Sequence, residues 1–289
     1  MRVERLAGID DPRAAVYRSL RRVAALRRDR SFVAEGARVV RQLLASPLRV
    51  RSLLLDERWL AELAPLCDAR PEPDLVAFVV SKDELERIVG FHVHQGVMAV
   101  AEAPEPPDLF ATLGARADAF VVALEGVSNA ENVGGILRTV AGFGGAGLLI
   151  DAATCDPFVR RAARVSMGAV FRVPVWRTDD LAGTLRALRE RCGVRALAAH
   201  LKGRLVTLDD ADLGGRVAVV LGSEATGLSD ALAEACDAAV EIPMADGWYC
   251  LNVANAGAVV MWEIARRRRA GVPADPGVSG SRGSPAPSA

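Results

Sequence analysis

The sequence predicts an α/β protein in which mostly parallel sheets are covered by helices on both faces. Apolar runs of about five residues, the length of a buried strand, alternate along most of the 289 residues with segments of helical character. Apolar residues make up 51% of the chain and charged residues 25%. This ordinary globular mixture argues against disorder over the whole length. At about 150 residues per domain, the chain has room for one large domain or two medium ones.

The first hundred residues contain the elements of a smaller α/β unit. An Asp-Pro pair supplies a cap and a first helical position, and it predicts a basic helix over 11–26. Ser81 and Glu84 have the spacing of a capping box, which predicts a short helix over 81–89. The other elements expected in this unit are a helix over 35–45 and strands over 50–55, 75–80 and 96–101.

A proline-rich run separates this unit from the rest of the chain. Three prolines lie within residues 103–108 and predict a stiff, extended linker. We place this linker at 103–117, between domains at 1–102 and 118–270. Residues 271–289 are rich in Gly, Ser and Pro and are expected to form a disordered tail.

The second unit continues the alternation of strands and helices. Its expected strands cover 119–124, 147–150, 173–176, 194–199 and 216–221, with a further strand that ends at Pro243. Its expected helices cover 132–141, 157–165, 178–191, 229–236 and 251–269. Residues 142–147 match the GxGxxG pattern of dinucleotide-binding proteins, but the pattern here follows a helix instead of opening one. A helix stop and a tight turn are therefore favoured, and a nucleotide-dependent oxidoreductase is a weaker alternative.

Composition also bears on location and metal content. No run approaches the ~18 apolar residues that a membrane span needs, and the N-terminus lacks the apolar segment of a secretory signal. The five cysteines are scattered without a CxxC pair. This argues against a zinc site and a disulfide framework, and it favours a cytoplasmic protein. His92 and His94 would share one side of a strand, but without a third ligand nearby we expect no metal site.

The distribution of charge, and not its total, points to a polyanionic partner. Lys+Arg and Asp+Glu both number 36, yet residues 1–51 contain thirteen Arg and five Asp or Glu. Arginine presents a planar fork that suits phosphate. A second arginine group lies in the middle of the chain, at Arg160, Arg161, Arg164 and Arg172. The excess has two interpretations, which are a contact surface for a polyanion and a compositional bias with solvated helix faces.

Residues 124–138 run from a strand end through a polar loop into a helix. Asn132 lies where a helix cap is expected. Gly134 and Gly135 lie in the first helical turn, where glycine costs stability relative to alanine. Their presence predicts that another backbone or a ligand comes close there. Arg138 lies less than two turns further on and can point back toward the strand ends, where ligands bind in open α/β sheets.

Two further polar loops follow predicted strands. Residues 219–229 form a buried strand and a glycine-flanked loop with Glu224 at its centre. In residues 240–254 a strand ends at Pro243, and Leu251-Asn252 opens the last helix. Each loop by itself is compatible with an ordinary turn between two elements.

Taken in order, the three segments resemble the motifs of the SpoU (TrmH) family of RNA ribose 2′-O-methyltransferases, within the SPOUT superfamily. The resemblance spans about 119–267. Its motif positions are Asn132, Gly134 and Arg138, then Gly222, Glu224 and Gly227, and finally Ile242-Pro243-Met244 and Leu251-Asn252-Val253. Residues 31–101 also resemble the substrate-binding domain of this family, through Phe32-Val-Ala-Glu-Gly36 and Gln95-Gly96.

The chain departs from the family pattern at three places. Cys250 and Ala254 stand where the family usually has serine, and Asn129-Ala130 stands where it has Asp-Pro. Because cysteine hydrogen-bonds only weakly, these changes affect the expected hydrogen-bond network of the third motif. They also support an alternative function, a non-catalytic RNA-binding protein on the same scaffold.

The resemblance implies a fold and a cofactor. The fold is a SPOUT-type methylase domain with a C-terminal trefoil knot, preceded by a smaller α/β RNA-binding domain of the kink-turn-binding ribosomal-protein type. The cofactor is S-adenosylmethionine, bound in the knot largely by backbone groups. The implied cofactor-binding residues are Leu221, Gly222, Ile242, Met244, Leu251 and Asn252.

The resemblance also implies how methyl transfer is performed and on what substrate. Arg138 is the implied catalytic residue, with Asn132 orienting Arg138 or the ribose and Glu224 holding its loop. A guanidinium suits the positioning of a phosphate and the stabilisation of a developing alkoxide. The implied RNA contacts are Arg22, Arg28, Arg160 and Arg164. A homodimer is implied, and the expected target is ribosomal RNA in preference to transfer RNA.

Overall fold

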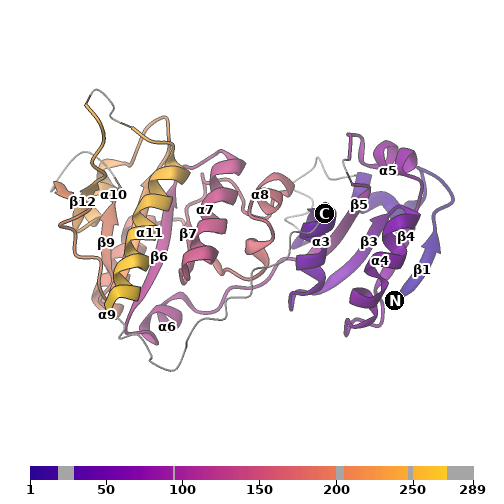
Figure 1. Cartoon of the computed structure of the whole chain (residues 1–289), viewed down its shortest axis with the longest axis horizontal. Coiled ribbons are helices and arrows are strands. Elements are labelled where there is room, and N and C mark those ends of the chain that lie inside the picture. The colour runs from indigo at the N-terminus through magenta and orange to yellow at the C-terminus, as the bar shows by residue number, and fades with distance from the viewer. Residues whose placement is uncertain (19–28, 94, 200–204, 247–249, 272–289) are drawn as a thin grey trace.

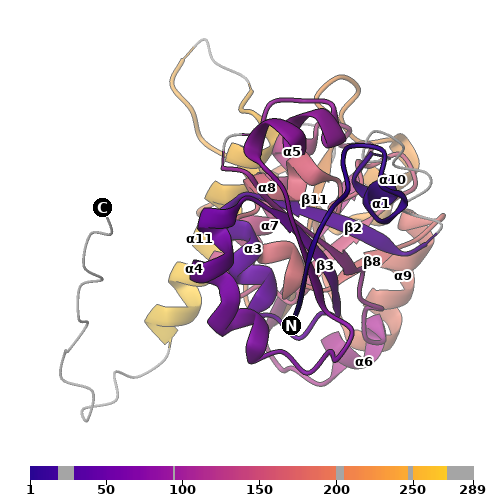
Figure 2. The same cartoon turned by 90° about the vertical axis from the view of Figure 1, so that its right-hand side faces the viewer.

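The computed structural model describes residues 1–18, 29–93, 95–199, 205–246 and 250–271. Two sheets lie along the long axis of the molecule, the N-terminal sheet on the right of Figure 1 and the C-terminal sheet on the left. In Figure 2 the N-terminal unit faces the viewer, with the C-terminal unit behind it. Helices pack against both sheets, as the predicted α/β class requires. No helix in the described parts of the chain is both long enough and apolar enough to cross a membrane.

The described strands of the N-terminal sheet follow the order β1-β4-β3-β5-β2. The strands β1 (Arg2–Arg5), β4 (Val76–Val79) and β3 (Val50–Leu55) are parallel. The strand β5 (Val97–Glu102) runs antiparallel to β3 and to β2 (Ser31–Glu35). β3 has the predicted bounds, whereas β1 and β2 were not predicted. β1 is mostly exposed and is defined by its pairing with β4, so its local sequence carries little strand signal.

Helices cover both faces of this sheet. On one face lie α3 (Ala37–Leu44) and α4 (Glu57–Asp68), which share a core with strand side chains. On the other face lie the short helix η1 (Pro12–Ala14), α1 (Ala15–Arg18) and α5 (Lys82–Val89). The N-terminal unit thus has three layers, with a hydrophobic core on each side of its sheet.

The three helices predicted in this unit agree with the structure to different degrees. The capping box of α5 is confirmed, because Ser81 Oγ accepts from the amide of Glu84 at 3.2 Å and Glu84 Oε2 accepts from the amide of Ser81 at 2.8 Å. The helix predicted over 35–45 begins two residues late, since Glu35 is the last residue of β2, paired with Met98. Of the helix predicted over 11–26, η1 and α1 are described, and the remainder from residue 19 lies outside the described residues.

The described strands of the C-terminal sheet follow the order β10-β12-β9-β11-β6-β7-β8, and every pairing between them is parallel. In that order they are β10 (Leu205–Thr207), β12 (Ala238–Glu241), β9 (Arg195–Ala198), β11 (Arg216–Gly222), β6 (Ala119–Glu125), β7 (Gly147–Ile150) and β8 (Val175–Arg177). Because all carboxyl ends of a parallel sheet meet at one edge, the loops that follow these strands share that edge.

Two sets of helices cover this sheet, and β6 supplies side chains to both. One face packs against α7 (Ala130–Phe143), α8 (Arg160–Val165), η2 (Ala169–Phe171) and α11 (Val253–Gly271). The other face packs against α6 (Leu109–Gly114), α9 (Leu181–Cys192) and α10 (Asp230–Ala235). Val122 and Leu124 point into the first core and Val121 and Ala123 into the second, as the two-residue period of a strand requires.

The boundary regions differ in part from their predicted extents. Regular structure is absent from 103–108, but α6 occupies 109–114 of the range proposed as the linker. Leu109 and Leu113 are buried in the second core, so this helix packs with the C-terminal unit. At the other end, Gly271 is the last residue of α11, and the rest of the predicted tail lies outside the described residues.

Candidate active site

The three motif segments meet at the carboxyl edge of the C-terminal sheet. β6 and β11 are neighbours, and their last residues Glu125 and Gly222 are paired in register. The loop after β6 leads into α7, and the loop after β11 carries Glu224. The last helix, α11, packs against both α7 and β11. Segments whose bonded residues lie 92 and 120 residues apart in sequence are thereby brought to one place.

Asn132 is the centre of a hydrogen-bond cluster that joins the three motifs. Its Nδ2 donates to Glu224 Oε1, and its Oδ1 accepts from Asn252 Nδ2 at 3.1 Å. Asn132 is buried, whereas Glu224 and Asn252 are exposed at the rim. Because both ends of its amide are bonded within the protein, the side chain of Asn132 is held in one orientation.

The expectation that Asn132 caps its helix is wrong. α7 begins at Ala130, and Asn129 is the N-cap, its Oδ1 accepting from the amide of Glu131 at 2.8 Å. Asn132 is the third residue of the helix, and Asn129 already supplies the side-chain cap. That position frees the amide group for Glu224 and Asn252.

The glycines of the second motif are required by a tight loop. A Cβ at Gly222 would lie 2.5 Å from the carbonyl carbon of Gly227, a backbone atom that has no room to move. The amide of Gly227 donates to the carbonyl of Ser223 at 2.8 Å, and Gly227 has a φ of +69°, which favours glycine. The loop closes on itself with Glu224 at its tip, so its backbone sets where this carboxylate lies.

The glycines of the first motif allow close packing on both sides of α7. A Cβ at Gly134 would lie 2.6 Å from the carbonyl oxygen of Ala162 in α8. A Cβ at Gly135 would lie 3.6 Å from the Cβ of Ala254 in α11. The prediction that another backbone comes close is therefore confirmed at Gly134. Ala254, one of the departures from the family pattern, contributes a small side chain to the contact with Gly135.

The third motif is organised by Asn252. Its Oδ1 accepts from the amide of Ala254 at 2.9 Å, which satisfies one of the unpaired donors at the start of α11. The same side chain donates to Asn132 through its Nδ2. Expected only as a cofactor contact, Asn252 thus also ties the start of α11 to α7. Its neighbour Cys250 is exposed.

Arg138 stands apart from this cluster. It is exposed on α7 and hydrogen-bonds to none of the cluster residues. Among the residues that the structure describes, it has no hydrogen-bond or ion-pair partner. Six residues of helix separate it from Asn132 by about 9 Å along the axis and by about 240° around it. The guanidinium is consequently available to a bound substrate.

The predicted cofactor contacts differ in how far they are accessible. The side chain of Leu221 is 1% exposed and packs beneath α11, so only its backbone can serve a ligand. Ile242 and Met244 are half-buried after β12, and Leu251 is 42% exposed. Apolar side chains are therefore left partly uncovered in the third motif, whose Asn252 belongs to the polar cluster, a combination that suits a nucleoside-like ligand.

The predicted RNA contacts are divided by the structure. Arg22 and Arg28 lie outside the described residues. Arg160 forms an ion pair with Glu35 of the N-terminal unit, a pairing that the sequence did not indicate. Arg164 is about half exposed and lies 3.9 Å from the same carboxylate. The sequence signal for such a partner was the place of Glu35 directly after the apolar residues 32–34.

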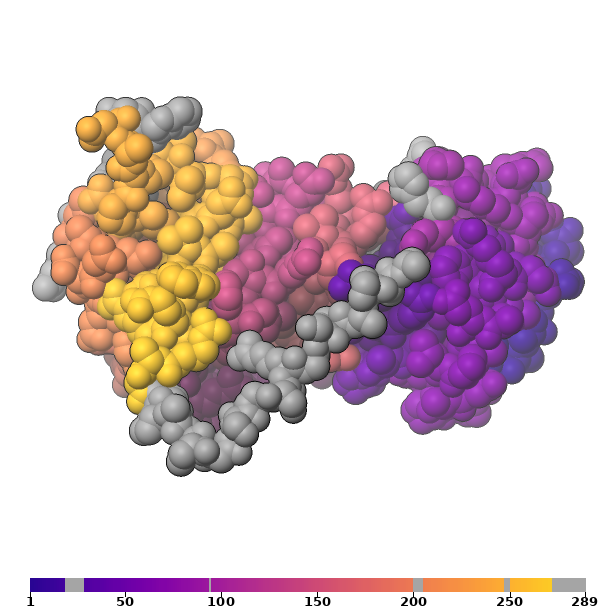
Figure 3. All heavy atoms as spheres, viewed as in Figure 1, coloured from indigo at the N-terminus to yellow at the C-terminus, as the bar shows by residue number. Residues whose placement is uncertain are grey.

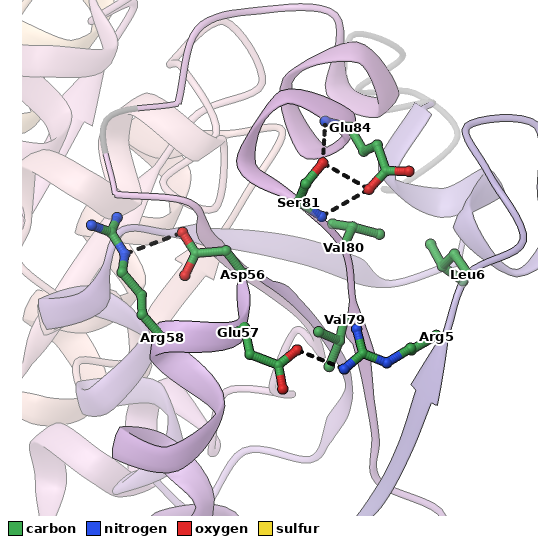
Figure 4. Close-up of a pocket in the computed structure, with 9 residues that line it drawn as sticks. All are labelled: Arg5, Leu6, Asp56, Glu57, Arg58, Val79, Val80, Ser81 and Glu84. Carbon is green, nitrogen blue, oxygen red and sulfur yellow. Dashed lines mark hydrogen bonds and ion pairs between the residues drawn. The ribbon is translucent and has the colours of Figure 1, made fainter.

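A separate hollow of about 590 Å³ lies in the N-terminal unit, at the carboxyl ends of β1, β3 and β4 (Figure 4). Its charged side chains pair with one another, as Arg5 does with Glu57 at 3.0 Å and Arg58 with Asp56 at 3.1 Å. Since Glu84 also lines the hollow and bonds to Ser81, acidic groups balance the basic ones. The hollow therefore offers no net attraction to a polyanion. Within the described residues, no group of His, Cys, Asp and Glu side chains is arranged to hold a metal ion.

Comparison with known proteins places this geometry in a family. The model of the SpoU rRNA Methylase family matches residues 119–262, and the model for RNA 2′-O ribose methyltransferase substrate binding matches residues 33–107. An uncharacterised tRNA/rRNA methyltransferase of Mycobacterium bovis is 36% identical over 265 residues, covering 89% of this chain and 90% of that protein. The chain belongs to the SpoU methylase family.

Solved structures extend the similarity of this SpoU protein to both units. An AdoMet-bound rRNA methyltransferase from Sinorhizobium meliloti has a TM-score of 0.80 at 27% identity, covering 92% of this chain and 98% of that one. The SpoU methyltransferase AviRb from Streptomyces viridochromogenes has a TM-score of 0.77 at 25% identity, covering 90% and 99%. The predicted methylase domain with a substrate-binding domain before it is confirmed.

Proposed function

We propose that this SpoU protein is an S-adenosylmethionine-dependent RNA ribose 2′-O-methyltransferase. The observation that carries the proposal is the cluster at Asn132, which unites three motifs of a methyltransferase family at one sheet edge. Family membership and solved relatives with AdoMet support it. A non-catalytic RNA-binding role is not favoured, because Asn132, Glu224 and Arg138 are all present.

The residues at this edge fit S-adenosylmethionine. Ile242, Met244 and Leu251 offer apolar surface for the adenine ring, and Leu221 and Gly222 offer backbone groups. S-adenosylmethionine contains no phosphate, so its site needs no glycine-rich phosphate-binding loop. The glycines of 142–147 instead end α7, with Gly144 in the left-handed region. When bound, S-adenosylmethionine supplies a methyl group on a positively charged sulfur.

Arg138 is proposed to act on the RNA. A ribose hydroxyl becomes a good nucleophile only as its proton leaves, so negative charge develops on its oxygen. An exposed, permanently protonated guanidinium can hold an adjacent RNA phosphate and stabilise that charge. Asn132 and Glu224 keep the neighbouring loops in place, which brings the reacting groups into line.

The RNA is proposed to span both units. The N-terminal unit matches a substrate-binding family model, and Arg164 lies half exposed where the two units meet. We propose that this unit is of the kink-turn-binding ribosomal-protein type, which favours a structured target. Ribosomal RNA is the proposed substrate in preference to transfer RNA. Binding through phosphate contacts should weaken as salt rises.

A homodimer with a knotted C-terminal end is the proposed assembly. α11 lies on the surface of the C-terminal unit, in yellow in Figure 3. Val259 and Trp262 on this helix are 37% and 46% exposed, and Leu251 just before it is 42% exposed. We propose that a second copy covers this apolar surface. We further propose that the loops after β11 and β12 form the trefoil knot and that the enzyme is cytoplasmic.

The decisive test measures tritium transfer from labelled S-adenosylmethionine to ribosomal RNA taken from cells that lack this protein. We expect transfer by the native chain and a loss of about 10²- to 10³-fold in Arg138→Ala, with cofactor affinity unchanged by calorimetry. Cofactor binding without transfer to any RNA by the native chain would support the non-catalytic alternative. Full activity in the variant would remove Arg138 from the mechanism.

A further inference from the structure

The face between the two units contains a buried carboxylate from one and an arginine from the other. Glu35, the last residue of β2, has a side chain that is 5% exposed. It accepts a hydrogen bond from Arg160 of α8, and the guanidinium of Arg164 lies 3.9 Å away. Both of these ion-pair partners belong to the other unit. An unpaired buried charge is costly, so Glu35 favours the arrangement in which α8 is docked against it.

Arg160 is held on a second side as well. Its guanidinium carbon lies 3.9 Å from the ring centroid of Phe91, which belongs to the N-terminal unit. Stacking and ion pairing together fix the direction of a planar guanidinium more tightly than either does alone. The side chain of Arg160 is therefore committed to the N-terminal unit at two points.

Apolar contacts surround this polar contact. The ring of Phe32 in the N-terminal unit contacts the rings of Phe158 and Phe171 in the C-terminal unit, with centroids 5.1 and 5.4 Å away. A Cβ at Gly168 would lie 2.8 Å from the Cβ of Gln42, so the backbones on the two sides approach closely. The interface is a packed apolar surface that encloses the ion pairs of Glu35 with Arg160 and Arg164, and these pairs favour one orientation of the apolar surfaces.

The docked helix is also the neighbour of the catalytic helix. α8 packs against α7 where Gly134 leaves room for the carbonyl of Ala162, two residues after Arg160. α7 carries Asn132 and Arg138. A continuous set of packed groups therefore runs from Glu35 through Arg160 and α8 to the proposed catalytic residues.

We propose that Glu35 is a positioning residue that, through Arg160, fixes the substrate-binding unit relative to the catalytic helix. The RNA held by the N-terminal unit is thereby presented to Arg138 in a defined place. The kinetic part of this inference rests on the proposed function, whereas the docking part does not. Glu35 is buried at the contact between the units and bonds to none of the cluster residues at Asn132, so its loss should affect the recognition of RNA and leave the chemistry intact.

The test compares Glu35→Gln, Arg160→Gln and the native chain. We expect small-angle scattering to show a broader distribution of distances in both variants, and the KM for ribosomal RNA to rise about tenfold, with kcat and cofactor affinity within about twofold. The control is Glu62→Gln, which removes a carboxylate that pairs with Arg41 inside the N-terminal unit. It should leave both the scattering and the KM as in the native chain.

A charge exchange distinguishes positioning from simple destabilisation. Glu35→Arg combined with Arg160→Glu restores an ion pair across the interface, and we expect it to recover a narrower distance distribution and a lower KM than either single change. If Glu35→Gln does not fold, Arg160→Gln still answers the question, because its side chain is 37% exposed and its loss leaves the C-terminal core intact.

The inference is overturned if both neutralised variants scatter and bind as the control does, or if kcat falls while the KM is unchanged. It is also overturned if the exchange gives no recovery. Should the native chain transfer no methyl group to any RNA, the proposed function fails, yet the scattering of the same variants still decides whether Glu35 docks the two units.

Discussion

The N-terminal unit and the candidate active site of the C-terminal unit arrange charged and polar side chains in opposite ways. In the N-terminal unit, arginines and carboxylates mostly pair with each other, as Arg70 does with Glu72 at 2.5 Å in a nearly buried contact. At the candidate site, the cluster at Asn132 ends in the exposed groups of Glu224 and Asn252, and the exposed side chain of Arg138, further along the same helix, has no partner among the described residues. The first arrangement stabilises a scaffold, whereas the second leaves groups available for a ligand. The comparison shows that a high number of charged residues does not by itself indicate where the active site lies.

The largest effect should come from breaking a scaffold pair. Arg70 also donates to the carbonyls of Leu44, the last residue of α3, and of Leu48, so Arg70→Ala leaves Glu72 and several carbonyls unpaired. We expect the free energy of unfolding to fall by about 3–5 kcal/mol, measured by urea denaturation, with kcat retained at low temperature. The control Arg49→Ala removes the exposed pair with Asp74 and should cost under about 1 kcal/mol. A large loss of kcat in Arg70→Ala would break the distinction between the units.

A change at the candidate site of the C-terminal unit should reduce methyl transfer more than it reduces stability. Gly222→Ala places a Cβ against the backbone of Gly227 and displaces the loop that carries Glu224. We expect methyl transfer to fall about 100-fold, together with weaker cofactor binding. Gly214→Ala is the matched control, because the nearest atom to its new Cβ is 3.6 Å away. Native cofactor affinity in Gly222→Ala would show that this loop does not shape the site.

The third test concerns the packing that joins the units through α7 and α8. Gly134→Ala forces a Cβ to within 2.6 Å of the carbonyl of Ala162 and should cost about 2–3 kcal/mol in the free energy of unfolding. On the same helix, a Cβ at Gly142 meets nothing within 4 Å. Gly142→Ala should therefore stabilise by about 0.5–1 kcal/mol, because alanine is the better helix former. Equal stability of the two variants would contradict the close approach of α8.

The smallest effect is a dependence of stability on pH. Hydrogen bonds from Arg266 and then Arg267 lower the pKa of Glu263 on α11 to about 2. The contribution of this carboxylate is complete above its ordinary value of 4.5 and is lost as the pH falls toward 2. Glu263→Gln should therefore remove about 1 kcal/mol at neutral pH and reduce the loss of stability between pH 5 and pH 2, measured by thermal unfolding. An unchanged acid profile would contradict this assignment.

Local signals predicted much of the fold because they act within a few residues. The strand over 50–55, the strand over 147–150 and the capping box at Ser81 all appear where the sequence placed them. The glycines of 142–147 also act as predicted, with Gly144 ending α7 in the left-handed region. In each case apolar runs, caps and turn residues set the backbone without help from distant parts of the chain.

Other features depend on partners that are distant in the sequence. β1 exists because β4 pairs with it, and α4 forms as a helix although Pro65 lies inside it. Asn129 caps α7, whereas the side chain of Asn132 bonds to Glu224 and Asn252, which lie far from it in the sequence. Glu35 was assigned to a helix, since nothing near it in the chain indicates that Arg160 will neutralise its charge.

The sequence by itself determined the α/β class, the order of most elements and the three motifs that identify a methyltransferase family. Only the tertiary structure decided that Asn132, Glu224 and Asn252 form one hydrogen-bonded cluster and that Glu35 meets Arg160. The physical reason is range. Caps and periodicity act over a few bonds along the chain, whereas hydrogen bonds and ion pairs act over a few ångströms in space between residues that folding alone brings together.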